Sequence, residues 1–119
     1  MSITLRLLAG PEFHEEIRVR GPRFLIGRAE DCHLRLICPM VSRHHCELII
    51  EQDRLSIRDT HSKNGTYVNG EQVTADRQLR SGDLIDVGLR RLAVEISEAS
   101  AASMALEAGQ TRQPLLTSA

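Results

Sequence analysis

The stretch TYVNGEQV, residues 66–73, predicts a β-hairpin. Its two arms are short segments with the period of two residues that marks a strand with one buried face. Between them stands Asn69-Gly70, and a two-residue turn of type I′ needs positive φ at both central positions, which this pair adopts readily. The chain is therefore expected to reverse direction here between two antiparallel strands.

The same alternation recurs over most of the chain. Ile3, Leu5 and Leu7 share one face, and Ile17 and Val19 alternate with charged residues. Further strands are expected at 23–27, 34–36, 45–50, 54–59, 77–80, 84–87 and 90–96. Turn residues separate them at Gly10-Pro11, Gly21-Pro22, Asn64-Gly65, Ser81-Gly82-Asp83 and Gly88. Short strands spaced by about eight to twelve residues, with no helical pattern between them, indicate an all-β sandwich or barrel.

Length and charge restrict the class of protein. A chain of 119 residues is expected to form one domain, and because aromatic residues make up only 3%, aliphatic side chains must fill its core. The formal net charge is −1, from 15 basic and 16 acidic residues. A general nucleic-acid or membrane-surface binder needs a basic excess, so neither partner is expected.

The cysteines indicate a compartment. Cys32, Cys38 and Cys46 make an odd number, and the N-terminal stretch lacks the apolar run of a secretory signal. No segment approaches the length of a membrane span. The expectation is a cytoplasmic protein with free thiols.

Composition changes near the end of the chain. Residues 98–119 are rich in Ala and Ser and poor in β formers. A short helix over 98–108 would have Ser97 as its N-cap and Gly109 as its stop, although such a length is marginal in isolation. The alternative is a flexible tail or linker. The predicted organisation is therefore a folded unit at 1–97 and a tail at 98–119.

The stretch CPMVSRHHCEL, residues 38–48, holds the polar side chains with the most chemical potential. Ser42 and His45 could be a nucleophile and its base, but no G-x-S-x-G elbow or oxyanion loop accompanies them. Ser42 and Arg43 could instead donate hydrogen bonds to an anion.

A zinc site is a further alternative, because cysteines and histidines are dense between residues 32 and 46. They lack C-x-x-C and H-x-x-x-H spacing, and adjacent residues on a strand point to opposite faces. Cys46 is in phase with Leu48 and Ile50, which favours a core position. No metal ion or other cofactor is expected.

Four short motifs occur in order on this strand pattern: IGR at 26–28, SRHH at 42–45, NGT at 64–66 and NG at 69–70. Together they resemble the forkhead-associated (FHA) domain family, over about residues 3 to 96. The resemblance implies a sandwich of two mainly antiparallel sheets, the FHA/SMAD-like fold, whose loops at one end bind a phosphothreonine peptide. Phosphothreonine carries nearly two negative charges and three acceptor oxygens, so several converging donors suit it.

The resemblance assigns ligand-binding roles to individual residues. It implies that Arg28 and Ser42 are the central phosphate ligands, with Arg43 and Lys63 as adjacent donors. Without this company, Arg28 would be read as a surface arginine paired with Glu30 or Asp31. Asn64 is expected to read the main chain of the peptide, and Asn69 either to do the same or to tie loops together.

The remaining motif residues are expected to be structural. His45 matches the family's structural histidine, which holds Ser42 in place, and His44 occupies a variable, solvent-facing position. The other structural positions are Gly27, Gly65, Thr66 and Gly70, where the glycines meet backbone requirements.

The sequence therefore predicts a phosphothreonine-dependent interaction module, not an enzyme, that recruits proteins phosphorylated by Ser/Thr kinases. The alternative is phosphate-independent interaction or weak self-association of an otherwise monomeric chain on the same fold. The resemblance also implies a preference for phosphothreonine over phosphoserine. Met40 stands where family members differ in how they read the peptide residues that flank the phosphothreonine. An apolar residue at this position suggests that the flanking peptide residue is not acidic. A further hypothesis is capture of phosphorylated Thr111 or Thr117 by a second copy, against the simpler reading of a polar tail.

Overall fold

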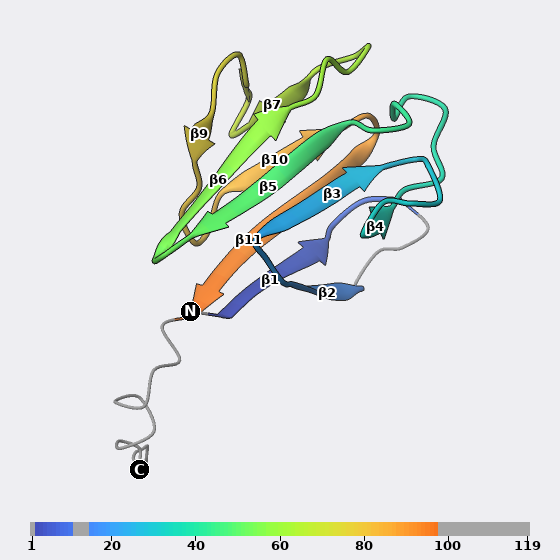
Figure 1. Cartoon of the computed structure of the whole chain (residues 1–119). Helices are drawn as coiled ribbons and strands as arrows, with labels where there is room; N and C mark the ends of the chain where they lie inside the picture. The colour runs from blue at the N-terminus through green and yellow to red at the C-terminus, as the bar shows by residue number, and fades with distance from the viewer. Residues whose placement is uncertain (1, 11–14, 98–119) are drawn as a thin grey trace.

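The computed structural model describes residues 2–10 and 15–97, which form a sandwich of two β-sheets (Figure 1). In chain order the strands are β1 (Ser2–Leu7), β2 (Glu16–Val19), β3 (Arg23–Gly27), β4 (Leu34–Arg35), β5 (Cys46–Glu51), β6 (Arg54–Asp59), β7 (Thr66–Val68), β8 (Glu71–Gln72), β9 (Arg77–Gln78), β10 (Leu84–Val87) and β11 (Arg90–Ser97). Each lies close to the bounds expected from its alternation. The prediction of an all-β sandwich is confirmed.

The two sheets divide the strands unevenly. The larger sheet has the order β2-β1-β11-β10-β7-β8, and the smaller has the order β4-β3-β5-β6-β9. The strand pairs are antiparallel except for β3 and β4, which run parallel. The short β4 thus continues in the direction of β3, which allows the next loop to return across the end of the sandwich.

The alternating side chains meet between the sheets. Leu5 and Leu7 of β1 face Leu48 of β5 and Ile57 of β6 across a core in which all four side chains are fully buried. Among the described residues, Phe24 is the only aromatic residue in this core, so aliphatic side chains fill it as expected. Burial of such side chains is the main stabilising term in folding.

The predicted hairpin is present between β7 and β8. Val68 pairs with Glu71 and Tyr67 with Gln72, which leaves Asn69-Gly70 as a two-residue turn. Both turn residues have positive φ, 52° and 86°, as a type I′ turn requires.

Several of the loops that connect the strands lie together at one end of the sandwich. The β3–β4, β4–β5 and β6–β7 loops and the β10–β11 turn lie together there (Figure 1). The described chain begins and ends at the opposite end, where Ser2 pairs with Ser97. The predictions for residues 98–119, a helix or a flexible tail, lie outside the described residues. Within residues 2–10 and 15–97, no helix has the length and apolar character needed to cross a membrane.

Candidate functional site

The end of β3 lies directly against the β4–β5 loop. The backbone N–H of Arg28 donates to the Ser42 carbonyl at 3.0 Å, and that of Ala29 donates to the Arg43 carbonyl at 3.0 Å. A methyl group on Gly27 would lie 2.2 Å from the Arg43 carbonyl oxygen, so only glycine permits this approach. The predicted structural role of Gly27 is therefore supported by a steric reason, and it joins the segments that carry Arg28 and Ser42.

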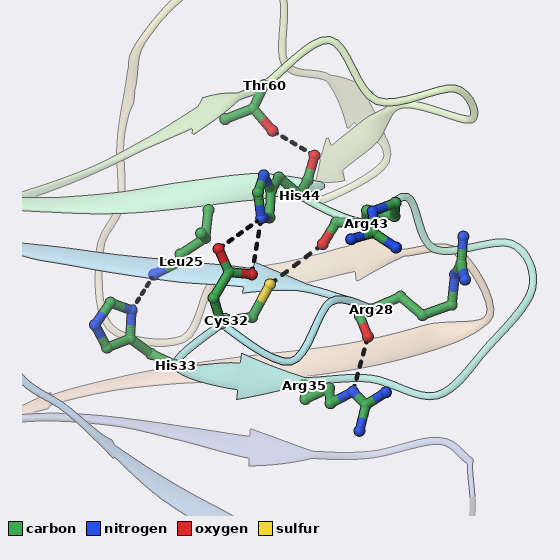
Figure 2. Close-up of polar contacts among 9 residues, drawn as sticks. Leu25, Arg28, Cys32, His33, Arg35, Arg43, His44 and Thr60 are labelled. Carbon is green, nitrogen blue, oxygen red and sulfur yellow. Dashed lines mark hydrogen bonds and ion pairs between the residues drawn. The ribbon is translucent and has the colours of Figure 1, made fainter.

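Arg28 extends from this junction along the β4–β5 loop (Figure 2). Its Nε donates to the Val41 carbonyl at 3.0 Å, which fixes the guanidinium beside the residue that precedes Ser42. Asp31, one of the two acids considered as its partner, pairs instead with His44. Among the described residues, the two terminal NH₂ groups of Arg28 have no hydrogen-bond partner, so they are available to an anion.

Ser42 is half-buried between two loops. Its hydroxyl oxygen accepts the backbone N–H of Lys63 at 2.9 Å, and its hydroxyl proton has no acceptor among the described residues, so it can donate to a ligand. The side chains of Lys63 and of Arg43 are exposed, and neither makes a hydrogen bond or an ion pair among residues 2–10 and 15–97. The predicted phosphate ligands thus come from three loops and contribute donors to one end of the sandwich. They are Arg28, Ser42, Arg43 and Lys63.

His45 is completely buried and both of its ring nitrogens are engaged. Nδ1 accepts the backbone N–H of Ser42 at 3.0 Å, so the ring proton is on Nε2, which donates to the Gly65 carbonyl at 2.8 Å. The imidazole therefore ties the β4–β5 loop to the β6–β7 loop. Neither nitrogen is left to act as a base for the Ser42 hydroxyl, which removes the geometry that a hydrolase would need.

The two asparagines have different surroundings. Asn64 Nδ2 donates to the Met40 carbonyl at 2.9 Å, and its other amide donor and its Oδ1 have no partner among the described residues. Asn69 uses both amide atoms within the protein, because Nδ2 donates to Asp83 and Oδ1 accepts from the Leu84 N–H, each at 3.0 Å. The contacts of Asn69 favour the tying of loops, and its peptide-binding role stays a prediction.

A network around Asp59, which the sequence motifs did not single out, shapes the β6–β7 loop. The carboxylate accepts hydrogen bonds from the Ser62 hydroxyl and N–H and from the Thr66 hydroxyl at 2.7 Å. Burial acts to raise the pKa of Asp59, but these bonds outweigh it and hold the pKa below its usual value. The spacing D-x-x-S at 59–62 was the available signal, since Asp side chains commonly cap turns in this way.

The loop also explains two predicted structural positions. Gly65 has φ of 85° and its N–H donates to the Ser62 hydroxyl at 3.0 Å, while Thr66 is fully buried against Asp59. Gly70 occupies the hairpin turn with φ of 86°. Each glycine therefore has a backbone conformation that other residues adopt poorly.

The cysteines and histidines considered for zinc are spread over different environments. All three cysteines are free, and Cys38 and Cys46 are buried, with burial raising the pKa of Cys46 to about 12. The donors of Asp31, Cys32 and His44 lie within 4.8 Å of one another. Two of these are already joined, as His44 Nε2 contacts both carboxylate oxygens of Asp31 at 2.9 and 3.0 Å (Figure 2).

A surface hollow of about 450 Å³ lies beside Arg28. Arg35 Nε donates to the Arg28 carbonyl at 2.8 Å, which places a further guanidinium on its wall (Figure 2). The residues that line it are mostly charged: Arg28, Ala29, Glu30, Asp31, Arg35, Arg43 and His44. This flank of Arg28 therefore suits polar or charged groups.

Comparison with known proteins agrees with this arrangement. The FHA domain model matches residues 24–88, which is more than half of the chain, and the chain therefore belongs to the FHA domain family. The matched range contains all of the predicted ligand and motif residues. Members of this family are phosphopeptide-recognition modules, so the domain is a binding module and not a catalytic one.

Individual relatives show the same family with different overall lengths. Glycogen accumulation regulator GarA of Mycobacterium tuberculosis is 38% identical over 79 residues, which cover 60% of this chain and 48% of GarA. The human proliferation marker protein Ki-67 is 33% identical over 76 residues, which cover 58% of this chain and 2% of Ki-67. The chain thus spans less than half the length of either relative.

Solved structures confirm the fold. An FHA domain studied for phosphothreonine-dependent interactions superposes with a TM-score of 0.75 at 33% identity, covering 82% of this chain and 98% of the other. The FHA domain of FhaA, solved in complex with the intracellular domain of a second protein, has a TM-score of 0.73 at 34% identity over 79% of this chain and all of that domain.

Proposed function

We propose that this domain binds a phosphothreonine segment of a partner protein and so recruits proteins phosphorylated by Ser/Thr kinases. The supporting observation is that Arg28 and Ser42, whose NH₂ groups and hydroxyl proton have no partner in the described part of the chain, belong to segments joined by direct hydrogen bonds. Arginine supplies a planar pair of donors that fits two phosphate oxygens, and Ser42 supplies a third donor from another direction.

The other ligand roles extend this proposal. Arg43 and Lys63 add positive charge at the rim, where exposed cations contribute modestly. Asn64, with a free amide donor and acceptor, binds the main chain of the peptide, and Asn69 supports the neighbouring turn or reaches the peptide. The structural motif residues hold the loops in the binding conformation. They are His45, Gly27, Gly65, Thr66 and Gly70.

Titration with a phosphothreonine peptide and its unphosphorylated twin tests the proposal directly. The wild type is expected to bind only the phosphorylated peptide. Arg28→Ala is expected to weaken binding by about tenfold to a hundredfold, since hydrogen bonds to charged groups are worth roughly 1.5–3 kcal/mol. Arg28→Lys keeps the positive charge and loses the planar pair of donors, so its affinity for the phosphorylated peptide should lie between those of the wild type and Arg28→Ala.

Arg54→Ala serves as the matched control, because Arg54 is an exposed arginine of β6 next to the β5–β6 turn, at the other end of the sandwich. It should bind like the wild type. Equal affinity for the two peptides would contradict the proposal and favour the alternative, a phosphate-independent or self-associating domain.

The finer assignments are also proposals. We infer a folded unit at 1–97 with a tail or linker at 98–119, a cytoplasmic location consistent with three free cysteines, and a monomer or weakly self-associating chain. A phosphoserine version of the same peptide tests the preference for phosphothreonine. Light scattering before and after kinase treatment tests capture of Thr111 or Thr117, and an unchanged mass would end that idea.

A further inference from the structure

Three side chains of the kinds that bind transition metals lie together where two loops meet. They are the carboxylate of Asp31, the thiol of Cys32 and the imidazole of His44, and their donor atoms all lie within 4.8 Å of one another. Asp31 and Cys32 belong to the β3–β4 loop, and His44 belongs to the β4–β5 loop (Figure 2). We refer to these three residues as the Asp-Cys-His cluster.

Hydrogen bonds hold the backbone of both loops at the cluster. The N–H of Cys32 donates to the Ala29 carbonyl at 3.2 Å, and the N–H of Ala29 donates to the Arg43 carbonyl at 3.0 Å. The Cys32 thiol donates to the same Arg43 carbonyl at 3.2 Å. On the other side, the His44 carbonyl accepts the Thr60 hydroxyl at 2.6 Å (Figure 2). The three side chains therefore stand on fixed backbone, and only the side chains need to move to bind an ion.

The spacing of the cluster is close to that of a tetrahedral zinc site. Zn–N and Zn–O bonds of about 2.0–2.2 Å and Zn–S bonds of about 2.3 Å place neighbouring ligand atoms about 3.4–3.6 Å apart. His44 Nε2 lies 2.9 Å from the nearer Asp31 oxygen, so these two atoms must separate by about 0.5 Å. The Cys32 sulfur lies within 4.8 Å of both, so it must approach by at most about 1.2 Å. Small rotations of the three side chains supply these shifts.

The types of donor select among ions. Thiolate and imidazole suit Zn²⁺, whereas Mg²⁺ and Ca²⁺ prefer oxygen ligands. To bind the ion, the Cys32 thiol loses its proton to solvent, so the two anionic ligands, Cys32 and Asp31, cancel the charge of Zn²⁺. The neutral complex does not repel the guanidinium groups of Arg28, Arg35 and Arg43, which line the adjacent hollow.

We propose that the Asp-Cys-His cluster binds one Zn²⁺ ion through three protein ligands and a water molecule, and so joins the β3–β4 loop to the β4–β5 loop. Three protein ligands with one open position are a common arrangement for zinc. Sequence spacing did not indicate this site, because one ligand is a carboxylate and the cluster forms only across two loops. None of the three residues is a proposed phosphate ligand, so the inference is independent of the proposed function.

A metal-free hydrogen bond between His44 and Asp31 is the competing explanation. The exposed fractions of these side chains are 47% and 65%, and an exposed pair of this kind stabilises a protein only slightly. Little stability is therefore lost when an ion that binds both side chains replaces their direct contact. The Cys32 sulfur beside the pair distinguishes the cluster from an ordinary surface pair.

Calorimetric titration of the full chain, without a histidine tag, with Zn²⁺ tests the inference. One ion should bind per chain, and Zn²⁺ should raise the melting temperature, because an ion that binds the folded state stabilises it. Mg²⁺ at the same concentration should do neither. Cys32→Ser and His44→Ala should each weaken Zn²⁺ binding by at least about tenfold, since even a residue that only supports a metal ligand is worth about 10–100-fold.

Co²⁺ in place of Zn²⁺ identifies the sulfur ligand, because a cobalt–thiolate bond has a charge-transfer band in the near ultraviolet. Cys38 and Cys46 are buried, so a band from the folded protein must come from Cys32. The wild type should show the band and Cys32→Ser should not. His61→Asn, which changes an exposed histidine of the β6–β7 loop, is the control and should keep both the band and the Zn²⁺ affinity.

Three results would overturn the inference. The first is a folded wild-type protein that takes up no Zn²⁺ or shows no cobalt–thiolate band, which is decided without any variant. The second is equal Zn²⁺ affinity in the wild type, Cys32→Ser and His44→Ala, which would place the ion elsewhere. The third is one ion per two chains together with a dimer in light scattering, which would assign the ion to an interface between copies.

Discussion

Gly27→Ala offers a direct test of how the site is assembled, because Gly27 is not one of the proposed ligand-binding residues. The added methyl group would lie 2.2 Å from the Arg43 carbonyl oxygen and 2.9 Å from Cys32 Sγ. Non-bonded contacts prefer separations near 3.5 Å, so β3 and the β4–β5 loop must separate by about 1 Å. The two backbone bonds across this junction, now 3.0 Å, would then approach 4 Å (about 1 Å longer), which is outside the hydrogen-bond range.

The energetic cost follows from these changes. Two lost hydrogen bonds contribute about 1 kcal/mol each, and the residual overpacking contributes about 1–3 kcal/mol. The expected destabilisation is therefore about 3–5 kcal/mol, a large part of a typical domain stability of about 5–15 kcal/mol. The melting temperature should fall by at least about 12 °C.

Binding should fall together with stability, because the junction sets the positions of Arg28 and Ser42. At a temperature where the variant is still folded, its affinity for a phosphothreonine peptide should be at least about tenfold weaker, given the value of charged hydrogen bonds. Thermal denaturation and peptide titration measure the two effects. Gly82→Ala is the control, since φ at Gly82 is 96° but a methyl group there meets nothing within 4 Å. It should cost about 1–2 kcal/mol and leave binding unchanged. A Gly27→Ala protein with wild-type stability and affinity would refute the reasoning.

Four further outcomes are expected. His45→Ala should lower the free energy of unfolding in urea by about 2–5 kcal/mol, because the Ser42 N–H and the Gly65 carbonyl lose buried partners; a loss under about 1 kcal/mol would contradict this. The pKa of Asp59 is lowered on folding, so the stability that its carboxylate contributes is full above about pH 4 and is lost as the pH falls through the folded-state pKa. In acid unfolding, Asp59→Asn should therefore lose less stability than the wild type as the pH falls. The same pH dependence of stability in both proteins would count against this reasoning. Peptide affinity should separately weaken below about pH 6, where the phosphate gains a proton, and a flat titration would argue against a dianionic ligand. Cys46, whose pKa is raised to about 12, should resist alkylation at neutral pH until the protein unfolds, and rapid labelling of the folded protein in mass spectrometry would oppose this.

Much of the fold could be predicted because it depends on local patterns. Alternation placed Leu5, Leu7 and Leu48 on inward faces, and each is fully buried. Asn69-Gly70 predicted a two-residue turn because few other pairs accept positive φ at both positions, and the structure has both. These features require only a few neighbouring residues to agree.

The site was less accessible to such reasoning, because its contacts join residues far apart in the chain. The motif residues could be named, yet nothing local indicated that Arg28 Nε binds the Val41 carbonyl or that Asp31 pairs with His44. The sequence also did not indicate that Leu89 is exposed, since an apolar residue after Gly88 is compatible with a core strand. Partners across loops depend on the packing of the whole sandwich, which alternation does not specify.

The antiparallel pairing of Ser2 with Ser97 gives the domain a geometry suited to insertion. Because the start of β1 and the end of β11 lie side by side, a longer polypeptide that carried this domain would enter and leave it at one place. Extra domains fused to either terminus would then project behind the module, and its recognition loops would remain facing outward towards a target.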